Sequence, residues 1–501
     1  MMRYRPLPWI AAALTLIFHA FGNAHYGFFR DELYFIACGR HPDVGYVDQP
    51  SLAPLMSAAS QVFGPSLFLL RFVAATCAAA AVFVTCLLVD DLGGDAFAQV
   101  IAAICVALAP VLASFGTKVS TDMLALSLWP LAALCTFRAL NRDPRWWLGV
   151  GLALGVAFNS KYSAIFFGAA LVAGPIVSGQ GRRLVNHWFV LGALLGVALA
   201  LPNAAWQLVH GLPMLELLRN GAAGKNVVLS PPQFVLQQIL ILNPVLSLVW
   251  IAGLAWSLMH RSLRWIGVAF LLLIILMIAL HAKDYYPAAF YPILFAAGGC
   301  AIEAWTLRAR WTRPLVAGVL AVCGLILLPF AMPILPVGTF IAYQSAFHLK
   351  PHSREHMELG VLPQDFGDMF GWPEMTGAIA AAYFSIPPDE RSRVLIYTAN
   401  YGEAAALDFF GRARGLPPAT SHHNQYYLWG TRGYTGRDPI VISINVSQSD
   451  MRKSFTSVRL ANEYAGAPLA IPLERDDPIL ISTGLKRPLA RAWPFTVKLY
   501  Y

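Results

Sequence analysis

The chain has 501 residues, of which 57% are hydrophobic and 13% are charged, and its net charge is +9. Soluble globular proteins carry about 25% charged residues, so a water-exposed surface over the whole chain is excluded. Residues 340–501 hold 16 basic and 15 acidic residues, so the excess positive charge lies in the apolar part. Membrane topology explains this charge better than binding to nucleic acid does.

The N-terminal two thirds of the chain contain apolar runs close to the length of membrane spans. A helix needs about 20 apolar residues to cross the hydrocarbon core of a bilayer. We therefore predict an all-α polytopic membrane domain over residues 1–336. Its expected spans, eleven in all, are 7–25, 66–89, 97–114, 120–139, 146–160, 163–178, 187–205, 234–257, 265–281, 286–305 and 314–335.

Basic residues are distributed unevenly among the loops between these runs. If the N-terminus is cytoplasmic, twelve arginines and five acidic residues fall on the cytoplasmic side. Eight basic and seven acidic residues then fall on the outer side. Cytoplasmic loops are enriched in arginine and lysine, so this orientation is favoured. An odd number of spans leaves residues 337–501 outside the membrane.

Residues 337–501 have the composition of a water-soluble domain. The apolar segments 393–397 and 439–444 favour buried strands, and segment 403–412 favours a helix. Proline pairs at 387–388 and 417–418 indicate turns. We predict an extracytoplasmic α/β domain.

The first outer loop, residues 26–65, carries an unusual set of polar side chains. Loops of this length are more often functional or disordered than plain connectors, and the aromatic content here argues against disorder. Adjacent residues of a helix do not face each other, so Asp31 and Glu32 should meet different partners. One would lie at a reaction centre and the other would fix the loop. The alternative is a solvated helix end with Arg30 as a counter-ion.

Further polar groups follow near the outer ends of later spans. Lys283 and the tyrosines after it fit either an aromatic belt with an extended lysine or a clamp for a lipid phosphate. Asp122 fits either a helix cap or part of a site. We find no motif of a soluble enzyme, such as a Walker loop or a His-Glu-x-x-His zinc motif.

The segments 30–34 (Arg-Asp-Glu-Leu-Tyr) and 45–50 (Gly-Tyr-Val-Asp-Gln-Pro) resemble the first periplasmic loop of the GT-C membrane glycosyltransferases. Within that fold they resemble family 39 and the protein-O-mannosyltransferase-like group, which includes the aminoarabinose transferases acting on lipid A. Segments 160–162 (Ser-Lys-Tyr) and 283–287 (Lys-Asp-Tyr-Tyr-Pro) fall where that group has later polar motifs. The resemblance covers residues 7–335.

The resemblance implies an inverting transferase in the bacterial cytoplasmic membrane, with a polyprenyl-phosphate sugar as donor and a lipid, glycan or protein as acceptor. It implies that Asp31 is the base that deprotonates the acceptor hydroxyl, and that Glu32 holds the loop or assists a metal. It leaves a divalent metal open as a cofactor. The other implied site residues form two groups. Those for the donor phosphate are Lys161, Lys283, Tyr285 and Tyr286, and those for the acceptor or the loop are Arg30, Tyr46, Asp48 and Asp122.

Two departures and two alternatives accompany this interpretation. The first loop has Ser51 where many relatives have a second proline. The outer domain, including residues 400–403, is not expected to match that of the lipid A enzymes, so the acceptor stays open. The alternative functions are a transporter or flippase of a lipid-linked substrate and a non-catalytic membrane scaffold. Transporters usually have repeats and broken helices at the membrane midplane, whereas the polar groups here gather at one face.

Overall fold

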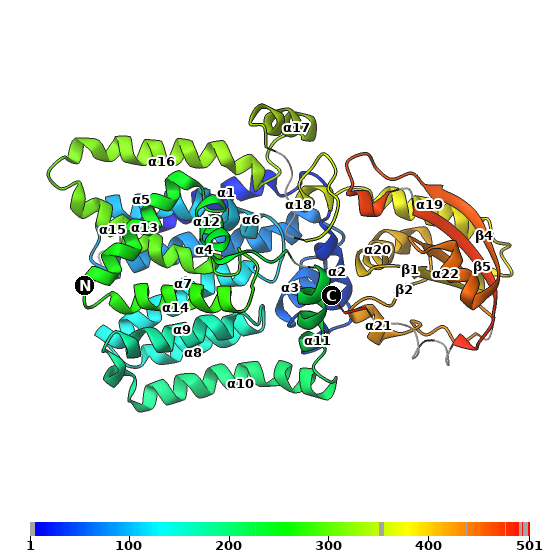
Figure 1. Cartoon of the computed structure of the whole chain (residues 1–501), viewed down its shortest axis with the longest axis horizontal. Helices are drawn as coiled ribbons and strands as arrows, with labels where there is room; N and C mark the ends of the chain where they lie inside the picture. The colour runs from blue at the N-terminus through cyan, green and yellow to red at the C-terminus, as the bar shows by residue number, and fades with distance from the viewer. Residues whose placement is uncertain are drawn as a thin grey trace.

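The computed structural model describes residues 6–225, 227–349, 355–436, 438–475, 477–489, 493 and 499–500. Long helices run side by side at one end of the molecule, and a small sheet with its own helices lies at the other end (Figure 1). Between the two lies a layer that contains α2 (Arg30–Gly39), α3 (Leu52–Ala59) and α11 (Pro213–Asn220). This layer belongs in sequence to the membrane part of the chain.

The helical end follows the apolar runs of the sequence. Its helices are α1 (Leu7–Gly22), α4 (Leu67–Asp91), α5 (Ala96–Leu108), α6 (Pro110–Thr117), α7 (Met123–Asn141), α8 (Trp146–Phe158), α9 (Ala164–Val177), α10 (His187–Val209), α12 (Pro231–Leu240), α13 (Pro244–Met259), α14 (Arg264–Ala279), α15 (Tyr291–Trp305) and α16 (Arg313–Leu327). Helix α17 (Val337–Ala346) follows them and begins the outer part of the chain.

Every predicted span coincides with one apolar helix or with one bent pair of helices. Among the described residues, five helices are long and apolar enough to cross a membrane, and four apolar helices are shorter. Two predicted spans, 97–114 and 234–257, are broken rather than continuous, with bends of 64° and 110°. The number of crossings and the orientation stay predictions.

The two breaks have a local cause. Pro110 and Pro244 each stand at the first position of the second helix of a pair. Proline has no N–H, and its ring clashes with the carbonyl four residues earlier, so neither helix can continue through it. Asn243 also has a φ of 77°, which no helical residue adopts. The breaks meet in space, because the N–H of Val111 donates to the carbonyl of Ile241 at 3.1 Å.

The outer part of the chain is an α/β unit, as predicted. Its strands are β1 (Val394–Thr398), β2 (Ala419–Ser421), β3 (Ile440–Ile444), β4 (Phe455–Tyr464) and β5 (Asp477–Leu485), in the order β2-β1-β3-β5-β4. Strand β1 pairs parallel with β2 and β3, and β5 pairs antiparallel with β3 and β4. The helices are α18 (Gln364–Gly367), α19 (Trp372–Phe384), α20 (Tyr401–Ala406), α21 (Gln425–Trp429) and α22 (Gln448–Ser454).

One hydrophobic core joins the first loop to the sheet unit. Side chains of α2, such as Leu33 and Ile36, pack in the same buried cluster as Trp372, Ile396 and Ala404. Burying a side chain of this size stabilises a fold by about 1.5–3 kcal/mol. The first loop is therefore held from both sides, and the predicted boundary at residues 336/337 stays a prediction.

Candidate active site

Glu32 fixes the first loop to the helix bundle. Its carboxylate accepts hydrogen bonds from Nε and Nη2 of Arg71 in α4 at 3.0–3.3 Å. The N–H groups of Phe29 and Val119 donate to it at 2.9 and 3.1 Å. The side chains of Glu32 and Arg71 are completely buried. Of the two roles expected for Glu32, this geometry supports the one that holds the loop.

Asp31, the next residue before it, points to a different partner, as the helical spacing predicts. The hydroxyl of Tyr401 in α20 donates to Oδ1 of Asp31 at 2.8 Å. About a third of the Asp31 side chain is exposed. Arg30 lies 3.9 Å from the same carboxylate and 3.4 Å from Asp368. Arg30 therefore lies beside Asp31, as the alternative interpretation expects of a counter-ion, but its side chain is largely buried and also approaches Asp368.

Residues 45–50 form hydrogen bonds with the rest of the first loop and with the outer domain. Tyr46 is fully buried, and its hydroxyl donates to the carbonyl of Cys38 at 2.9 Å. Asp48 accepts from the hydroxyl of Tyr34 at 2.9 Å and from the side-chain amide of Asn424 at 3.2 Å. Tyr46 thus supports the loop, whereas Asp48 connects the loop to the outer domain.

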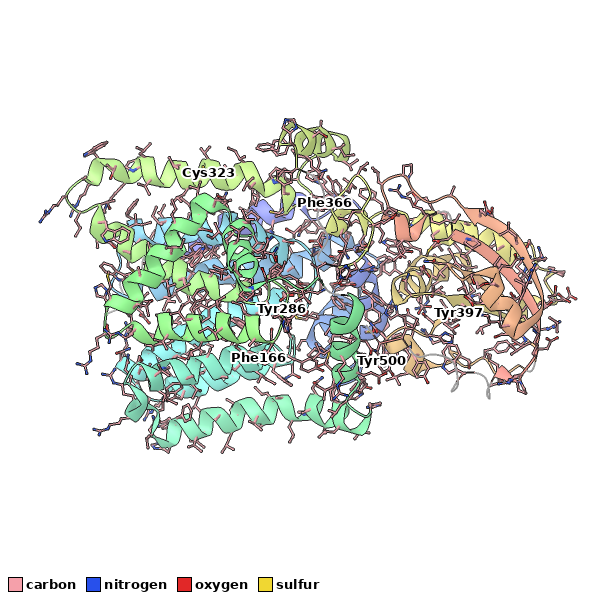
Figure 2. The ribbon with its side chains drawn as sticks, in the orientation of Figure 1. Phe166, Tyr286, Cys323, Phe366, Tyr397 and Tyr500 are labelled. Atoms are coloured by element: carbon pink, nitrogen blue, oxygen red, sulfur yellow. The ribbon has the colours of Figure 1, made fainter. Side chains whose placement is uncertain are left out.

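Lys161 and Asp122 form an ion pair. The ammonium of Lys161 donates to both carboxylate oxygens of Asp122 at 2.7 Å. The same ammonium lies 4.3 Å from the ring centre of Tyr286 and 5.1 Å from that of Tyr285. Asp122 stands at the N-cap position of α7, but its side chain makes no capping hydrogen bond there. Figure 2 shows Tyr286 at the end of the bundle that faces the outer domain.

Two other lysines are paired with acids from the segment between α17 and α19. Lys283 donates to Glu355 at 2.7 Å, and both side chains are largely buried. Lys118 lies 2.6 Å from Asp365. The outer domain therefore supplies an acidic partner to each of these lysines.

These groups surround a cavity of about 440 Å³ at the junction of the bundle and the outer domain. Its polar wall includes Arg30, Asp31, Asp48, Lys118, Asp122, Lys283, Glu355, Asp365 and Tyr401. Its apolar wall includes Pro110, Val111, Phe115, Ile241 and Phe330. Three of these apolar residues lie at the two helix breaks. A cavity with one charged and one apolar wall suits an amphipathic molecule.

The structure brings together six of the ten predicted site residues at the cavity wall: Arg30, Asp31, Asp48, Asp122, Lys283 and Tyr285. Glu32, Tyr46, Lys161 and Tyr286 lie behind the wall. Sequence reasoning missed Tyr401, Asp368, Glu355 and Asp365, because they come from the outer domain. No local spacing in the sequence relates these residues to the first loop.

A cluster of carboxylates that could bind a metal ion lies outside the cavity. Among the described residues, one such group is found, made of Glu403, Glu474 and Asp477, with ligand atoms within 4.8 Å of one another. All three are buried. Burial, together with the neighbouring carboxylate of Glu474, raises the pKa of Glu403 well above its usual range. Glu403 already accepts hydrogen bonds from the side-chain amides of Asn400 and Asn445.

Asp368 should make stability depend on pH. Burial raises its pKa to about 7, although the charge of Arg30 acts in the opposite direction. Between about pH 4 and pH 7 the native state therefore binds more protons than the unfolded chain, so this group lowers the unfolding free energy as pH rises. We expect the unfolding free energy of the wild type to fall relative to that of Asp368→Asn between about pH 4 and pH 7. Unfolding of both proteins in detergent at several pH values measures this, and a constant difference contradicts it.

The chain resembles known proteins in sequence and in fold. The family model described as dolichyl-phosphate-mannose-protein mannosyltransferase matches residues 44–206. Two crystal structures of ArnT from Cupriavidus metallidurans are similar to the chain. The structure bound to undecaprenyl phosphate has a TM-score of 0.63 at 13% identity, and the apo structure has 0.58 at 14%. Each superposition covers 95% of this chain and 97% of the other. No curated protein matches the chain in sequence.

The resemblance to the GT-C membrane glycosyltransferases is thereby confirmed. One expectation needs correction. Residues 337–501 make up about a third of the chain, so a superposition that covers 95% of it includes most of them. The outer domain therefore shares its fold with ArnT, although residues 400–403 suggested that it would not. Fold is kept at identities where sequence motifs are no longer visible, which is why the sequence did not reveal this.

Proposed function

We propose that this chain, which has the GT-C fold, transfers a sugar from a polyprenyl-phosphate donor to an acceptor hydroxyl at the outer face of the bacterial cytoplasmic membrane. The observation that carries the proposal is the cavity with two kinds of wall. It combines a carboxylate, Asp31, with an ammonium group, Lys283, beside apolar residues at the ends of membrane helices. The family match and the fold support the same class of reaction.

Each wall of the cavity has a part in the proposed reaction. The apolar wall receives the first isoprene units of the donor, and Lys283 binds its phosphate. The second carboxylate oxygen of Asp31 takes the proton of the acceptor hydroxyl. At the same time the oxygen of that hydroxyl attacks the anomeric carbon of the sugar. The bond from the anomeric carbon to the phosphate oxygen breaks, the configuration inverts, and polyprenyl phosphate leaves. Lys283 stabilises the negative charge that develops on the leaving phosphate.

The remaining partners of the site have supporting roles in this proposal. Lys161 neutralises Asp122, so that Asp122 can face the cavity without an uncompensated charge. Tyr285 lines the cavity together with Lys283. Arg30 and Asp48 orient the loop on which Asp31 stands.

The proposal is tested with the full-length protein purified in detergent. The donors are radiolabelled undecaprenyl-phosphate mannose and undecaprenyl-phosphate aminoarabinose, and the acceptors are extracted envelope lipids and glycans. We expect label to move from one donor to an acceptor, with an inverted anomeric configuration in the product. A transporter would carry the intact donor across a vesicle membrane, and a scaffold would do neither. Either of those two results would overturn the proposal.

Glu355 should compete with the donor phosphate for Lys283. The two side chains form a largely buried ion pair at 2.7 Å, so the phosphate must displace a carboxylate. Removing the charge of Glu355 should make the binding free energy of the donor more favourable by about 1 kcal/mol. This corresponds to a roughly fivefold lower KM for the donor in Glu355→Gln. Initial rates at varied donor concentration measure KM. The matched control is Glu390→Gln at the surface, and equal KM values for the two variants would contradict the expectation.

A further inference from the structure

Tyr401 brings the outer domain into direct contact with Asp31. Its hydroxyl donates to Oδ1 of Asp31 at 2.8 Å, and the residue lines the cavity. The guanidinium of Arg30 lies 5.6 Å from the centre of its ring. Tyr401 is 8% exposed, so its hydroxyl is directed into the cavity region and not into bulk water. No residue of the membrane part hydrogen-bonds the Asp31 carboxylate within the described chain.

The position of Tyr401 is fixed by the start of α20. The side chain of Asn400 accepts hydrogen bonds from the N–H groups of Gly402 and Glu403 at 2.9 and 3.0 Å. The carboxylate of Glu403 in turn accepts a hydrogen bond from the N–H of Asn400 at 3.3 Å. A reciprocal cap of this kind determines where a helix begins. Gly402 allows α20 to approach α2, because a Cβ there would lie 2.5 Å from Cγ of Arg30.

We propose that Tyr401 is a positioning residue for the base: it binds one oxygen of Asp31, orients the carboxylate, and leaves the second oxygen for the acceptor hydroxyl. The outer domain thus completes the active site of the membrane domain. This inference rests on the proposed function.

Tyr401 can serve as the donor throughout the neutral range. Burial raises its pKa well above the usual value, with Arg30 acting in the opposite direction. The charged and titratable groups around this pair come from several elements. They are Arg30 and Tyr34 in α2, Asp48 in the first loop, His423 beside the Tyr401 ring, Asp368 facing Arg30, and Lys118, Asp122 and Lys283 across the cavity.

The test is the pH dependence of kcat/KM for sugar transfer by Tyr401→Phe. Loss of one hydrogen bond worth about 1 kcal/mol should move the acidic limb of the profile upward by about 0.7 pH unit. The control is Tyr464→Phe, which removes a tyrosine hydroxyl that donates to the carbonyl of Gly371, away from the cavity. A purely structural role would lower activity evenly at every pH and leave the limb in place.

A second variant keeps the inference testable if Tyr401→Phe folds poorly. Replacing Tyr401 by 3-fluorotyrosine keeps the shape and makes the phenol a stronger donor, so the acidic limb should move downward. If the acidic limb of the kcat/KM profile is unchanged in both Tyr401 variants while Asp31→Asn is inactive, the inference is overturned and the proposed function stands. An active Asp31→Asn variant would overturn the role proposed for Asp31 itself, and the inference with it.

Discussion

Asp31→Asn is expected to lower the rate of sugar transfer by a factor on the order of 10² to 10⁴, which is the contribution of a positioned general base. The carboxylate is partly exposed at the cavity wall, and Tyr401 occupies only one of its oxygens. An amide has the same shape but takes up no proton at neutral pH. The donor should still bind, because Lys283 is unchanged. Single-turnover transfer of radiolabelled sugar and binding of undecaprenyl phosphate measure these two effects separately.

The control for this variant is Asp389→Asn, which removes an equivalent carboxylate from the exposed surface of the outer domain. Its transfer rate should equal that of the wild type. Asp31→Asn must also unfold at the wild-type temperature, because a loss of fold would lower activity for another reason. Transfer at the wild-type rate by a folded Asp31→Asn would exclude Asp31 as the base.

Arg71→Met is expected to lower the free energy of unfolding by about 3–5 kcal/mol, the effect of removing one partner from a buried ion pair. Both side chains of the Arg71–Glu32 pair are fully buried, so the remaining carboxylate would lie uncompensated in the protein interior. Arg71 also donates to two backbone carbonyls of the segment before α2, those of His25 and Gly27. The variant should therefore loosen the loop that carries Asp31. Unfolding in mixed detergent micelles measures the loss.

Two further variants test whether burial of the ion pair causes the expected loss of stability. Arg393→Met removes an arginine from surface pairs with Asp438 and Glu390. We expect it to lower the free energy of unfolding by at most about 1 kcal/mol. The double variant Arg71→Met, Glu32→Gln should be more stable than Arg71→Met alone, because no unpaired charge remains buried. If Arg71→Met is no less stable than Arg393→Met, the buried pair does not anchor the first loop.

Sequence patterns located the parts of the site that stand next to each other in the chain. Adjacent helical residues diverge by about 100°, so Asp31 and Glu32 had to meet different partners, and they do. Lys283 and Asp122 stood out because charged groups at a membrane surface are uncommon without a purpose. The same argument selected Lys161, which contacts Asp122 rather than the cavity. Local sequence shows that a lysine lies near the membrane surface. Which acidic group the lysine contacts depends on how the chain folds.

The sequence by itself determined the membrane class, the positions of the apolar helices and the α/β character of the outer part, because length, hydrophobicity and local periodicity are properties of neighbouring residues. It also identified the loop that carries Asp31. The tertiary structure alone decided that Tyr401, Glu355 and Asp365 line one cavity with Asp31 of this loop, and that two helix breaks meet to form the apolar wall. These contacts join residues distant in sequence, and the packing of the whole chain sets them.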